Sequence, residues 1–231
     1  MKAGLIIPAG GQGKRMGKGR PKQYLELDGE PILQHTLKTF QNSPSIDSIV
    51  LAVPENDIQE IEDQYQSKFN KIRHVTAGGK ERQDSVYNGF LKLDPDMEIV
   101  MVHDAVRPFV SQEIIGEAVD AAKTAGSAIV AIPLSDTLKR ADDAGKVKET
   151  IPRDNLWRVQ TPQAFRREIF AKAYEKALQD NFYGTDEASL VERLGVEIAI
   201  VTGSAFNLKI TRPEDLILGQ AILKAGQACG E

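Results

Sequence analysis

Glycine and positively charged residues are concentrated in one short segment near the start of the chain, residues 8–22, which reads PAGGQGKRMGKGRPK. Gly10, Gly11 and Gly13 lack the side chains that would hold a ligand away from the backbone, so several N–H groups can converge on phosphate oxygens. The segment contains five cationic side chains and no acidic one: Lys14, Arg15, Lys18, Arg20 and Lys22. In a chain whose formal net charge is −4, this concentration predicts a site for a polyanion such as a triphosphate.

Two common phosphate-binding motifs do not fit this segment. A Walker loop requires glycine five residues before its Gly-Lys pair and Ser or Thr after it, but Pro8 and Arg15 occupy those positions. A dinucleotide fingerprint would place its third glycine at position 16, which is Met16. A glycine-rich turn between a strand and a helix, with solvated lysines, stays open as the simpler interpretation.

A second group of chemically capable residues follows the apolar run at residues 99–102 and begins His103-Asp104-Ala105-Val106-Arg107. A carboxylate such as Asp104 at a strand end can hold Mg²⁺, which prefers oxygen ligands. An ion pair between Asp104 and Arg107 that stabilises a loop is an equal alternative. His103 is predicted to be structural, because no second His or Cys lies within metal-ligand spacing.

The remaining polar candidates are weak when each is taken alone. Thr185 is predicted to cap a helix that begins at Asp186. Lys209 is compatible with an ordinary lysine at the end of a strand. Thr137 and Arg153 carry no specific signal by themselves.

The elements that must position these residues alternate between strands and helices. Apolar runs predict strands at residues 3–7, 49–53, 72–75, 99–102, 127–132, 197–201 and 207–210. Helices are predicted at residues 30–40, 57–69, 112–124 and 166–179, after the Gly78-Gly79 pair to about 93, from 186, and from Pro213 onward. Ligands of open α/β sheets bind at the carboxyl ends of strands, so we expect the glycine-rich and charged segments to meet at that edge.

Residues 133–155 interrupt this alternation. Two short alternating segments flank an Asp-Ala-Gly turn and predict a projecting β-hairpin. A polar hairpin of this length has little core of its own, so we expect it to rest on something else, such as a second subunit.

Composition limits the class of protein. The 231 residues suffice for one α/β core, and 41% hydrophobic with 27% charged residues are ordinary values for a soluble globular protein. No apolar run approaches the roughly 20 residues that span a bilayer, and the single cysteine, Cys229, excludes an internal disulfide. A pI near 5.6 and 6% aromatic residues argue against a nucleic-acid partner. A cytoplasmic enzyme without membrane or nucleic-acid partners is expected.

Seven segments in order resemble one family. Pro-Ala-Gly-Gly-x-Gly-x-Arg-Met followed by Pro-Lys-Gln-Tyr is similar to the signature loop of nucleotidyltransferases that activate sugar and polyol phosphates. Together with six further segments, it resembles the 2-C-methyl-D-erythritol 4-phosphate cytidylyltransferase family over nearly the whole chain. The further segments are residues 78–86, 102–108, 136–140, 161–163, 185–189 and 207–216.

The resemblance implies a Rossmann-like α/β fold, with a mostly parallel twisted sheet, helices on both faces and a projecting β-arm. The arm would be residues 134–155 within a single domain, 1–231. It further implies a homodimer made partly by exchange of the arm. The implied reaction joins CTP and methylerythritol phosphate to give the CDP-linked alcohol and pyrophosphate, with Mg²⁺ as the expected cofactor.

The resemblance also implies roles for individual residues. The triphosphate would be held by Pro8, Ala9, Gly10, Gly11, Gly13, Arg15 and Lys22. The cytidine would be held with help from Gly79, Ser85 and Ala105. The polyol phosphate would face Asp104, Arg107, Thr137, Arg153, Thr161, Thr185 and Lys209, several of them across the dimer. The catalytic residues would be Arg15, Lys22, Asp104 and Lys209, with Asp104 as the metal ligand.

Two departures and two alternatives accompany this resemblance. Lys80 stands where an acidic residue often follows the glycine pair, which puts a side-chain contact to cytosine in doubt, and Gly10 replaces a common alanine. A cytidylyltransferase for another polyol phosphate, such as ribitol 5-phosphate, would have nearly the same CTP site. A catalytically silent CTP-binding regulatory module is the alternative from a different class, and the presence of both Arg15 and Lys22 argues against it.

Overall fold

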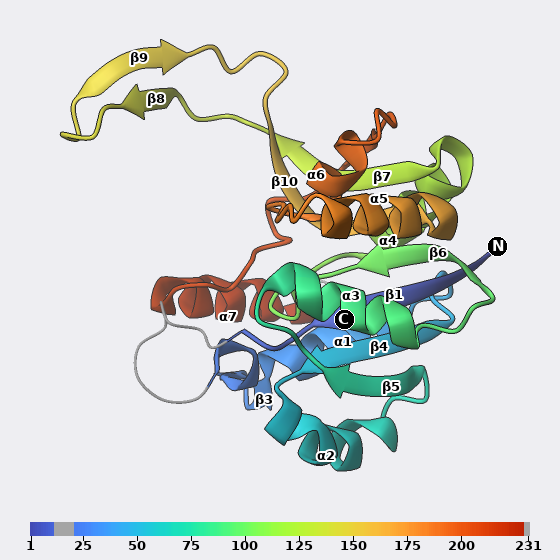
Figure 1. The fold of residues 1–231 in the computed structure, drawn as a ribbon. Helices are drawn as coiled ribbons and strands as arrows, with labels where there is room; N and C mark the ends of the chain where they lie inside the picture. Colours follow the sequence, from blue (N-terminus) through green and yellow to red (C-terminus); the bar gives the residue numbers. More distant parts are fainter. Residues whose placement is uncertain (12–20, 229–231) are drawn as a thin grey trace.

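A seven-stranded sheet forms the centre of the computed structural model, which describes residues 1–11 and 21–228 (Figure 1). The strand order is β11-β7-β10-β6-β1-β4-β5. Only β10 runs antiparallel to its neighbours, β6 and β7, so the predicted mostly parallel sheet is confirmed. The strands are β1 (Lys2–Pro8), β4 (Ser48–Val53), β5 (Ile72–Ala77), β6 (Met97–Val102), β7 (Ser127–Pro133), β10 (Trp157–Arg166) and β11 (Ala199–Thr202).

Helices cover both faces of the sheet, as predicted. One face packs against α1 (Ile32–Gln41), α2 (Ile58–Ile61) and α4 (Gln112–Ala125), and the other against α3 (Arg82–Lys92), α5 (Arg167–Gln179) and α6 (Glu187–Glu192). Alternation along β1 supplies both cores, because Leu5 and Ile7 join the first and Ile6 joins the second. The strands are therefore apolar on both sides, as a covered parallel sheet requires.

The helix predicted at residues 57–69 is present in a mixed form. A 3-10 turn at Glu55–Asp57 precedes α2, and a π-helical turn at Glu62–Gln66 follows it. Ile61, Tyr65 and Phe69 are buried, so the predicted apolar face packs on the sheet although the backbone hydrogen-bond pattern changes along it.

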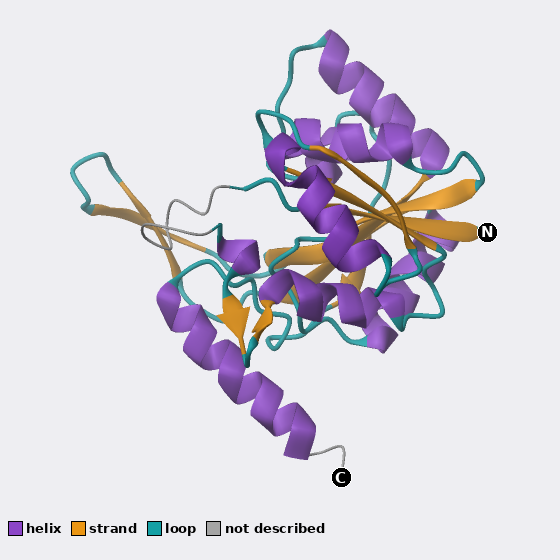
Figure 2. Ribbon diagram, turned by 90° about the horizontal axis from the view of Figure 1, so that it is seen from below, coloured by secondary structure: helices purple, strands orange, loops and turns teal. Residues whose placement is uncertain are grey.

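A small third core lies beside the carboxyl end of the sheet. The ribbon of β2 (Glu26–Leu27) and β3 (Glu30–Pro31) meets α7 (Pro213–Ala228) there, around the buried residues Leu27, Ile32, Val106 and Ile210. Figure 2 shows α7 extending away from the sheet past this ribbon. The described part of the chain contains no helix with both the length and the apolar character that crossing a membrane requires.

The predicted hairpin is confirmed. Strands β8 (Leu138–Ala141) and β9 (Val147–Ile151) pair antiparallel, with Leu138 opposite Ile151. They project far from the sheet (Figure 1), and every residue from 135 to 150 is exposed. The hairpin leaves β7 and returns into β10, so both ends of its stem are anchored in the central sheet.

The strand predicted at residues 207–210 is wrong. The segment is irregular, because N–H groups of Asn207 and Ile210 donate to acceptors outside a strand ladder. The fully buried Asn207 donates its amide to the Thr161 carbonyl at 2.9 Å, and the Ile210 N–H donates to the Val106 carbonyl at 2.9 Å. The chain thereby crosses the carboxyl end of the sheet and carries Lys209 to Asp104.

Candidate active site

One pocket lies where the carboxyl ends of β1, β5 and β6 meet, at the edge that the sequence predicted. The structure brings together there the backbone after β1, the glycine pair after β5 and the charged turn after β6. The lining residues are Pro8, Ala9, Gly10, Gly11, Lys22, Gln23, Gly79, Lys80, Glu81, Arg82, Ser85, Asp104, Ala105, Val106 and Lys209. Gly13 and Arg15 lie outside the described residues.

The two ends of the glycine-rich segment are tied together. The Ala9 N–H donates to the Ala52 carbonyl at 2.7 Å and continues the pairing of β1 with β4. The side-chain amide of the buried Gln23 donates to the Ala9 carbonyl from the 3-10 helix at Lys22–Tyr24. Lys22 is thus fixed beside the end of β1, where a cation can face a bound triphosphate.

The glycine pair after β5 forms a tight cradle. A Cβ atom at Gly79 would stand 2.2 Å from the Cβ of Asp84, so only glycine fits. The Gly79 N–H donates to the Ser85 hydroxyl at 2.9 Å, and that hydroxyl donates to the Glu81 carbonyl at 3.1 Å. Glu81 and Asp84 complete a capping box at the start of α3, so the cradle is rigid.

The glycine-rich segment and the cradle face each other. A Cβ atom at Gly10 would lie 3.8 Å from the Ser85 hydroxyl, which is an ordinary contact. An alanine would fit at position 10, so the glycine found there is a minor departure from the family pattern.

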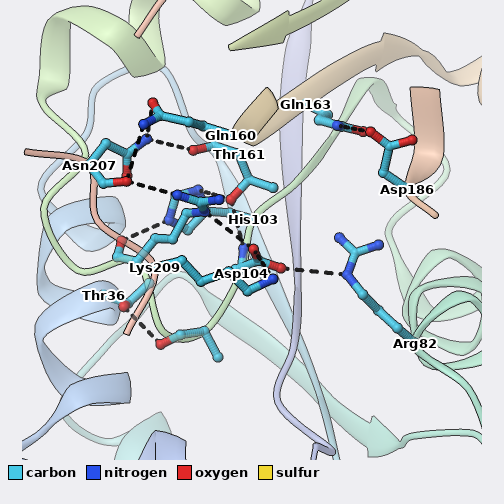
Figure 3. Close-up of polar contacts among 12 residues, drawn as sticks. Thr36, Arg82, His103, Asp104, Gln160, Thr161, Gln163, Asp186, Asn207 and Lys209 are labelled. Atoms are coloured by element: carbon cyan, nitrogen blue, oxygen red, sulfur yellow. Dashed lines mark hydrogen bonds and ion pairs between the residues drawn. The ribbon is translucent and has the colours of Figure 1, made fainter. Parts of the chain in front are cut away.

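The turn after β6 is held by a chain of hydrogen bonds through His103 (Figure 3). The Arg107 carbonyl can only accept, so His103 Nε2 donates to it at 2.9 Å. His103 Nδ1 then accepts from the Thr161 hydroxyl at 3.1 Å, and the Thr161 oxygen accepts from the Asp104 N–H at 3.1 Å. Burial lowers the pKa of His103 to about 4 and keeps its ring neutral, and both ring nitrogens have partners within the protein, as the predicted structural role requires.

Asp104 lies among three cations. Its Oδ2 lies 2.8 Å from Lys209 Nζ and 3.3 Å from Arg107 Nε, and its Oδ1 lies 3.5 Å from Arg82 Nε. Burial would raise the pKa of the Asp104 carboxyl, but the charges of Lys209, Arg82 and Arg107 outweigh it and hold the pKa well below its ordinary value. Of the two alternatives weighed from the sequence, the Asp104–Arg107 ion pair is present.

These contacts do not fit a resident Mg²⁺ on Asp104. Both carboxylate oxygens already face cations, and Arg107 and Lys209, for which the described residues supply no carboxylate partner besides Asp104, would repel a dication there. Within residues 1–11 and 21–228, no group of three His, Cys, Asp or Glu side chains could hold a metal ion.

Sequence reasoning missed Arg82 and its partner Glu187. Arg82, in the first turn of α3, lines the pocket, and its Nη1 lies 2.7 Å from Oε1 of the buried Glu187 in α6. Both residues lie in segments that carry the family resemblance, so their opposite charges were a usable signal. Their pairing across more than one hundred residues was not visible in the spacing.

Of the predicted polyol contacts, Asp104 and Lys209 line the pocket, and the others lie around it. Lys209 and Arg107 line an adjoining groove that also contains Arg158. Thr161 is buried behind Asp104, with its hydroxyl hydrogen directed to His103. Thr137 and Arg153 are exposed in the stem of the hairpin, where Arg153 donates to the Ser135 carbonyl.

The predicted cap of α6 is wrong by one residue. Asp186 is the N-cap: its Oδ1 accepts from the Ser189 N–H at 3.0 Å, and its Oδ2 accepts from Gln163 at 2.8 Å (Figure 3). The carboxylate satisfies the N–H of the first turn and the Gln163 amide together. Thr185 is left exposed at the surface, free of a capping role.

The chain matches one protein family over nearly its whole length. Residues 3–225 match the protein family described as 2-C-methyl-D-erythritol 4-phosphate cytidylyltransferase. Proteins of that name from Syntrophus aciditrophicus and Geotalea uraniireducens are 49% and 46% identical, over 95% and 97% of this chain and 94% and 98% of theirs.

Solved structures agree with these sequence matches. The 4-diphosphocytidyl-2C-methyl-D-erythritol synthase of Anaerococcus prevotii is 35% identical, with a TM-score of 0.84 and 96% of each chain covered. The 2-C-methyl-D-erythritol 4-phosphate cytidylyltransferase of Francisella tularensis is 32% identical, with a TM-score of 0.82, over 96% of this chain and 100% of that one.

Proposed function

The chain belongs to the 2-C-methyl-D-erythritol 4-phosphate cytidylyltransferase family, and from this premise we propose how its residues perform the reaction. It is an enzyme that makes CDP-methylerythritol from CTP and methylerythritol phosphate for isoprenoid biosynthesis. The observation that carries the proposal is the single pocket that joins the glycine-rich segment, the glycine cradle and the Asp104 cluster.

CTP occupies the side of the pocket formed by the glycine-rich segment and the glycine cradle. The backbone of residues 8–11 and Gly13, with Arg15 and Lys22, holds the triphosphate. Gly79, Ser85 and Ala105 hold the cytidine. The hydrogen bonds of the cradle support this assignment, because they hold Gly79 and Ser85 in one conformation before the base arrives.

The polyol phosphate occupies the side of the pocket formed by Asp104 and Lys209, next to Arg107 in the adjoining groove. The excess of positive charge over the single Asp104 carboxylate supports this placement, because it suits a phosphate dianion. Thr161 contributes from behind by holding the Asp104 backbone. Thr185 faces the same substrate from the end of the chain segment before α6, and Thr137 and Arg153 reach it from a second subunit.

The reaction is an in-line displacement at the α-phosphorus of CTP. An oxygen of the polyol phosphate forms the new P–O bond while the bond to the bridging oxygen of pyrophosphate breaks. A phosphate monoester, with a second pKa of about 6, is already ionised at neutral pH, so no general base is required. Catalysis consists of positioning and charge neutralisation, in which Arg15 and Lys22 stabilise the negative charge that builds on the α-phosphate and the leaving pyrophosphate.

Mg²⁺ enters this scheme with the triphosphate and not as a resident ion on Asp104. The three cations around Asp104 support this division. Isothermal titration of Mg²⁺ into the enzyme without CTP should give no site that Asp104→Asn removes. A Mg²⁺ site that does disappear in Asp104→Asn would return the metal to Asp104.

The enzyme works in the cytoplasm as a single domain, residues 1–231, and as a homodimer joined through the arm at residues 134–155. The exposure of the whole hairpin supports the dimer, because strands without a core of their own gain stability by packing on a partner. Subcellular fractionation tests the location, and analytical ultracentrifugation tests the dimer.

The activity itself is tested by pyrophosphate release with CTP and Mg²⁺, with methylerythritol phosphate and ribitol 5-phosphate offered in parallel. Release with methylerythritol phosphate alone is the expected result. A preference for ribitol phosphate would favour a different polyol substrate. CTP binding with no release from either substrate would favour a silent regulatory module.

A further inference from the structure

We propose that Arg82, held by Glu187, is a positioning residue that fixes the orientation of the Asp104 carboxylate. The inference rests on the proposed function, in which Asp104 faces the polyol phosphate. It goes further by identifying what keeps that carboxylate in one orientation before substrate arrives. Two side chains do so: Arg82 from helix α3 and Glu187 from helix α6.

Glu187 anchors the Arg82 guanidinium inside the protein. Glu187 is 2% exposed, and its Oε1 and Oε2 lie 2.7 and 3.0 Å from Arg82 Nη1. The buried Tyr174 hydroxyl adds a hydrogen bond to Glu187 Oε1 at 3.3 Å. A buried carboxylate is costly unless it is paired, so the ion pair with Glu187 is strongly favoured. Glu187 therefore holds the Arg82 guanidinium in one place.

Arg82 extends from this anchor to Asp104. Its Nε lies 3.5 Å from Asp104 Oδ1, whereas Lys209 and Arg107 make their closest approaches to Oδ2 (Figure 3). The two oxygens are thus drawn to opposite sides, which restrains rotation of the carboxylate. The planar guanidinium can bridge two carboxylates in this way because its N–H groups point in fixed directions.

The charges of the pair are compatible with this role. Burial lowers the pKa of the Arg82 guanidinium, but the carboxylates of Glu187 and Asp104 raise it above its ordinary value, so Arg82 stays charged. Because Glu187 balances the charge of Arg82, the pair orients Asp104 without adding a net charge beside the incoming phosphate. Lys209 and Arg107 remain to attract that phosphate.

The experiment compares Arg82→Lys, Glu187→Gln and Asp104→Asn with the wild-type enzyme by pyrophosphate release, with kcat and the KM of each substrate determined separately. A lysine at position 82 keeps the positive charge but lacks the planar group whose separate nitrogens face the two carboxylates in fixed directions. Arg82→Lys and Glu187→Gln are expected to lower kcat by about 10- to 100-fold while the KM for CTP stays within about twofold of wild type. Asp104→Asn is expected to lose more.

Two further variants separate positioning from folding. Tyr174→Phe weakens the anchor of Glu187 but leaves its ion pair with Arg82, so kcat should fall less than in Glu187→Gln, whatever the change in Tm. Arg193→Lys alters an arginine–aspartate pair at Asp180, outside the pocket lining, and should leave kcat unchanged. If kcat follows Tm across all variants, the pair is merely structural and the inference is overturned.

The double variant Arg82→Lys/Asp104→Asn completes the test. If Arg82 acts through Asp104, the double variant should be no slower than Asp104→Asn alone, whereas multiplied losses would overturn the inference. Full turnover by Arg82→Lys and Glu187→Gln, with loss in Asp104→Asn, would overturn positioning but keep the proposed function. Full turnover by Asp104→Asn would reject the proposed role of Asp104 and the inference together.

Discussion

Within the described part of the glycine-rich segment, residues 8–11 and 21–22, Lys22 is the cationic residue, and it lines the pocket. If its charge stabilises the transition state, Lys22→Ala should lower kcat by orders of magnitude while the protein remains folded. Steady-state kinetics with both substrates and circular dichroism measure the two effects. Near-normal turnover by the folded variant would remove Lys22 from the catalytic residues.

Thr161 has a single hydroxyl hydrogen, which the His103 ring nitrogen accepts. Thr161→Ser keeps that hydroxyl and should retain most of the activity. Thr161→Val is nearly isosteric but leaves His103 Nδ1 and the Asp104 N–H without their partner, so it should lose about 1–3 kcal/mol of stability for the unsatisfied groups. Urea unfolding and kcat are measured for both variants. Equal stability and equal kcat would contradict the assignment of the Thr161 hydroxyl as the donor to His103 Nδ1.

His103 also makes stability depend on pH. Its folded pKa is about 4, below the ordinary value of 6.5, so between these values the unfolded chain binds more protons than the folded one. The neutral ring thus stabilises the fold fully above pH 6.5, and this contribution falls as the pH drops toward 4, by roughly 3 kcal/mol at most.

Urea unfolding at pH 7 and pH 5 should therefore show a larger loss in wild type than in His103→Gln. His74→Gln serves as the matched control, because it makes the same substitution at a histidine that is exposed on β5. An unchanged pH dependence in His103→Gln would assign the effect to other groups.

At the scale of elements, the start of α3 depends on glycine at the end of the preceding loop. Gly79→Ala would force its Cβ within 2.2 Å of Asp84, so the cradle and the first turn of α3 must move apart. A displacement of about 1 Å is expected to lower kcat/KM for CTP by about 100-fold.

Gly10→Ala is the matched control for that variant. Its new methyl group would lie 3.8 Å from Ser85, so activity should be close to wild type. Comparable losses of kcat/KM in both variants would show that any added methyl group near the pocket lowers activity, and that the Gly79 cradle has no special role.

At the scale of the whole molecule, the hairpin leads to a prediction about sharing of residues between subunits. If Arg153 acts in the partner's site, a heterodimer of one Lys22→Ala chain and one Arg153→Ala chain contains one intact site and one doubly defective site. Mixing the two inactive proteins after unfolding and refolding should restore about a quarter of the wild-type activity, because half of the dimers are mixed. Each variant refolded alone is the control, and no recovery on mixing would place Arg153 in its own subunit's site.

The sequence alone determined most of the helices and strands. It also determined the edge of the sheet at which the glycine-rich and charged segments meet. Strands such as β1 and β6 and helices such as α4 follow from apolar periodicity, which reports the burial of each element, and the hairpin follows from its turn residues. Because polar segments after parallel strands share one edge, the meeting of the glycine-rich segment, the cradle and Asp104 was predictable.

Only the tertiary structure decided which side chains meet. Residues 207–210 have the composition of a strand, yet the buried Asn207 Nδ2 donates to the Thr161 carbonyl, and no ladder forms. Arg82, Glu187 and Asp104 are distant in the chain and carry ordinary charges, so their spacing predicts no contact. The packing of α3 and α6 on the same face of the sheet brings them together, because burying a charge requires a partner that local sequence does not specify.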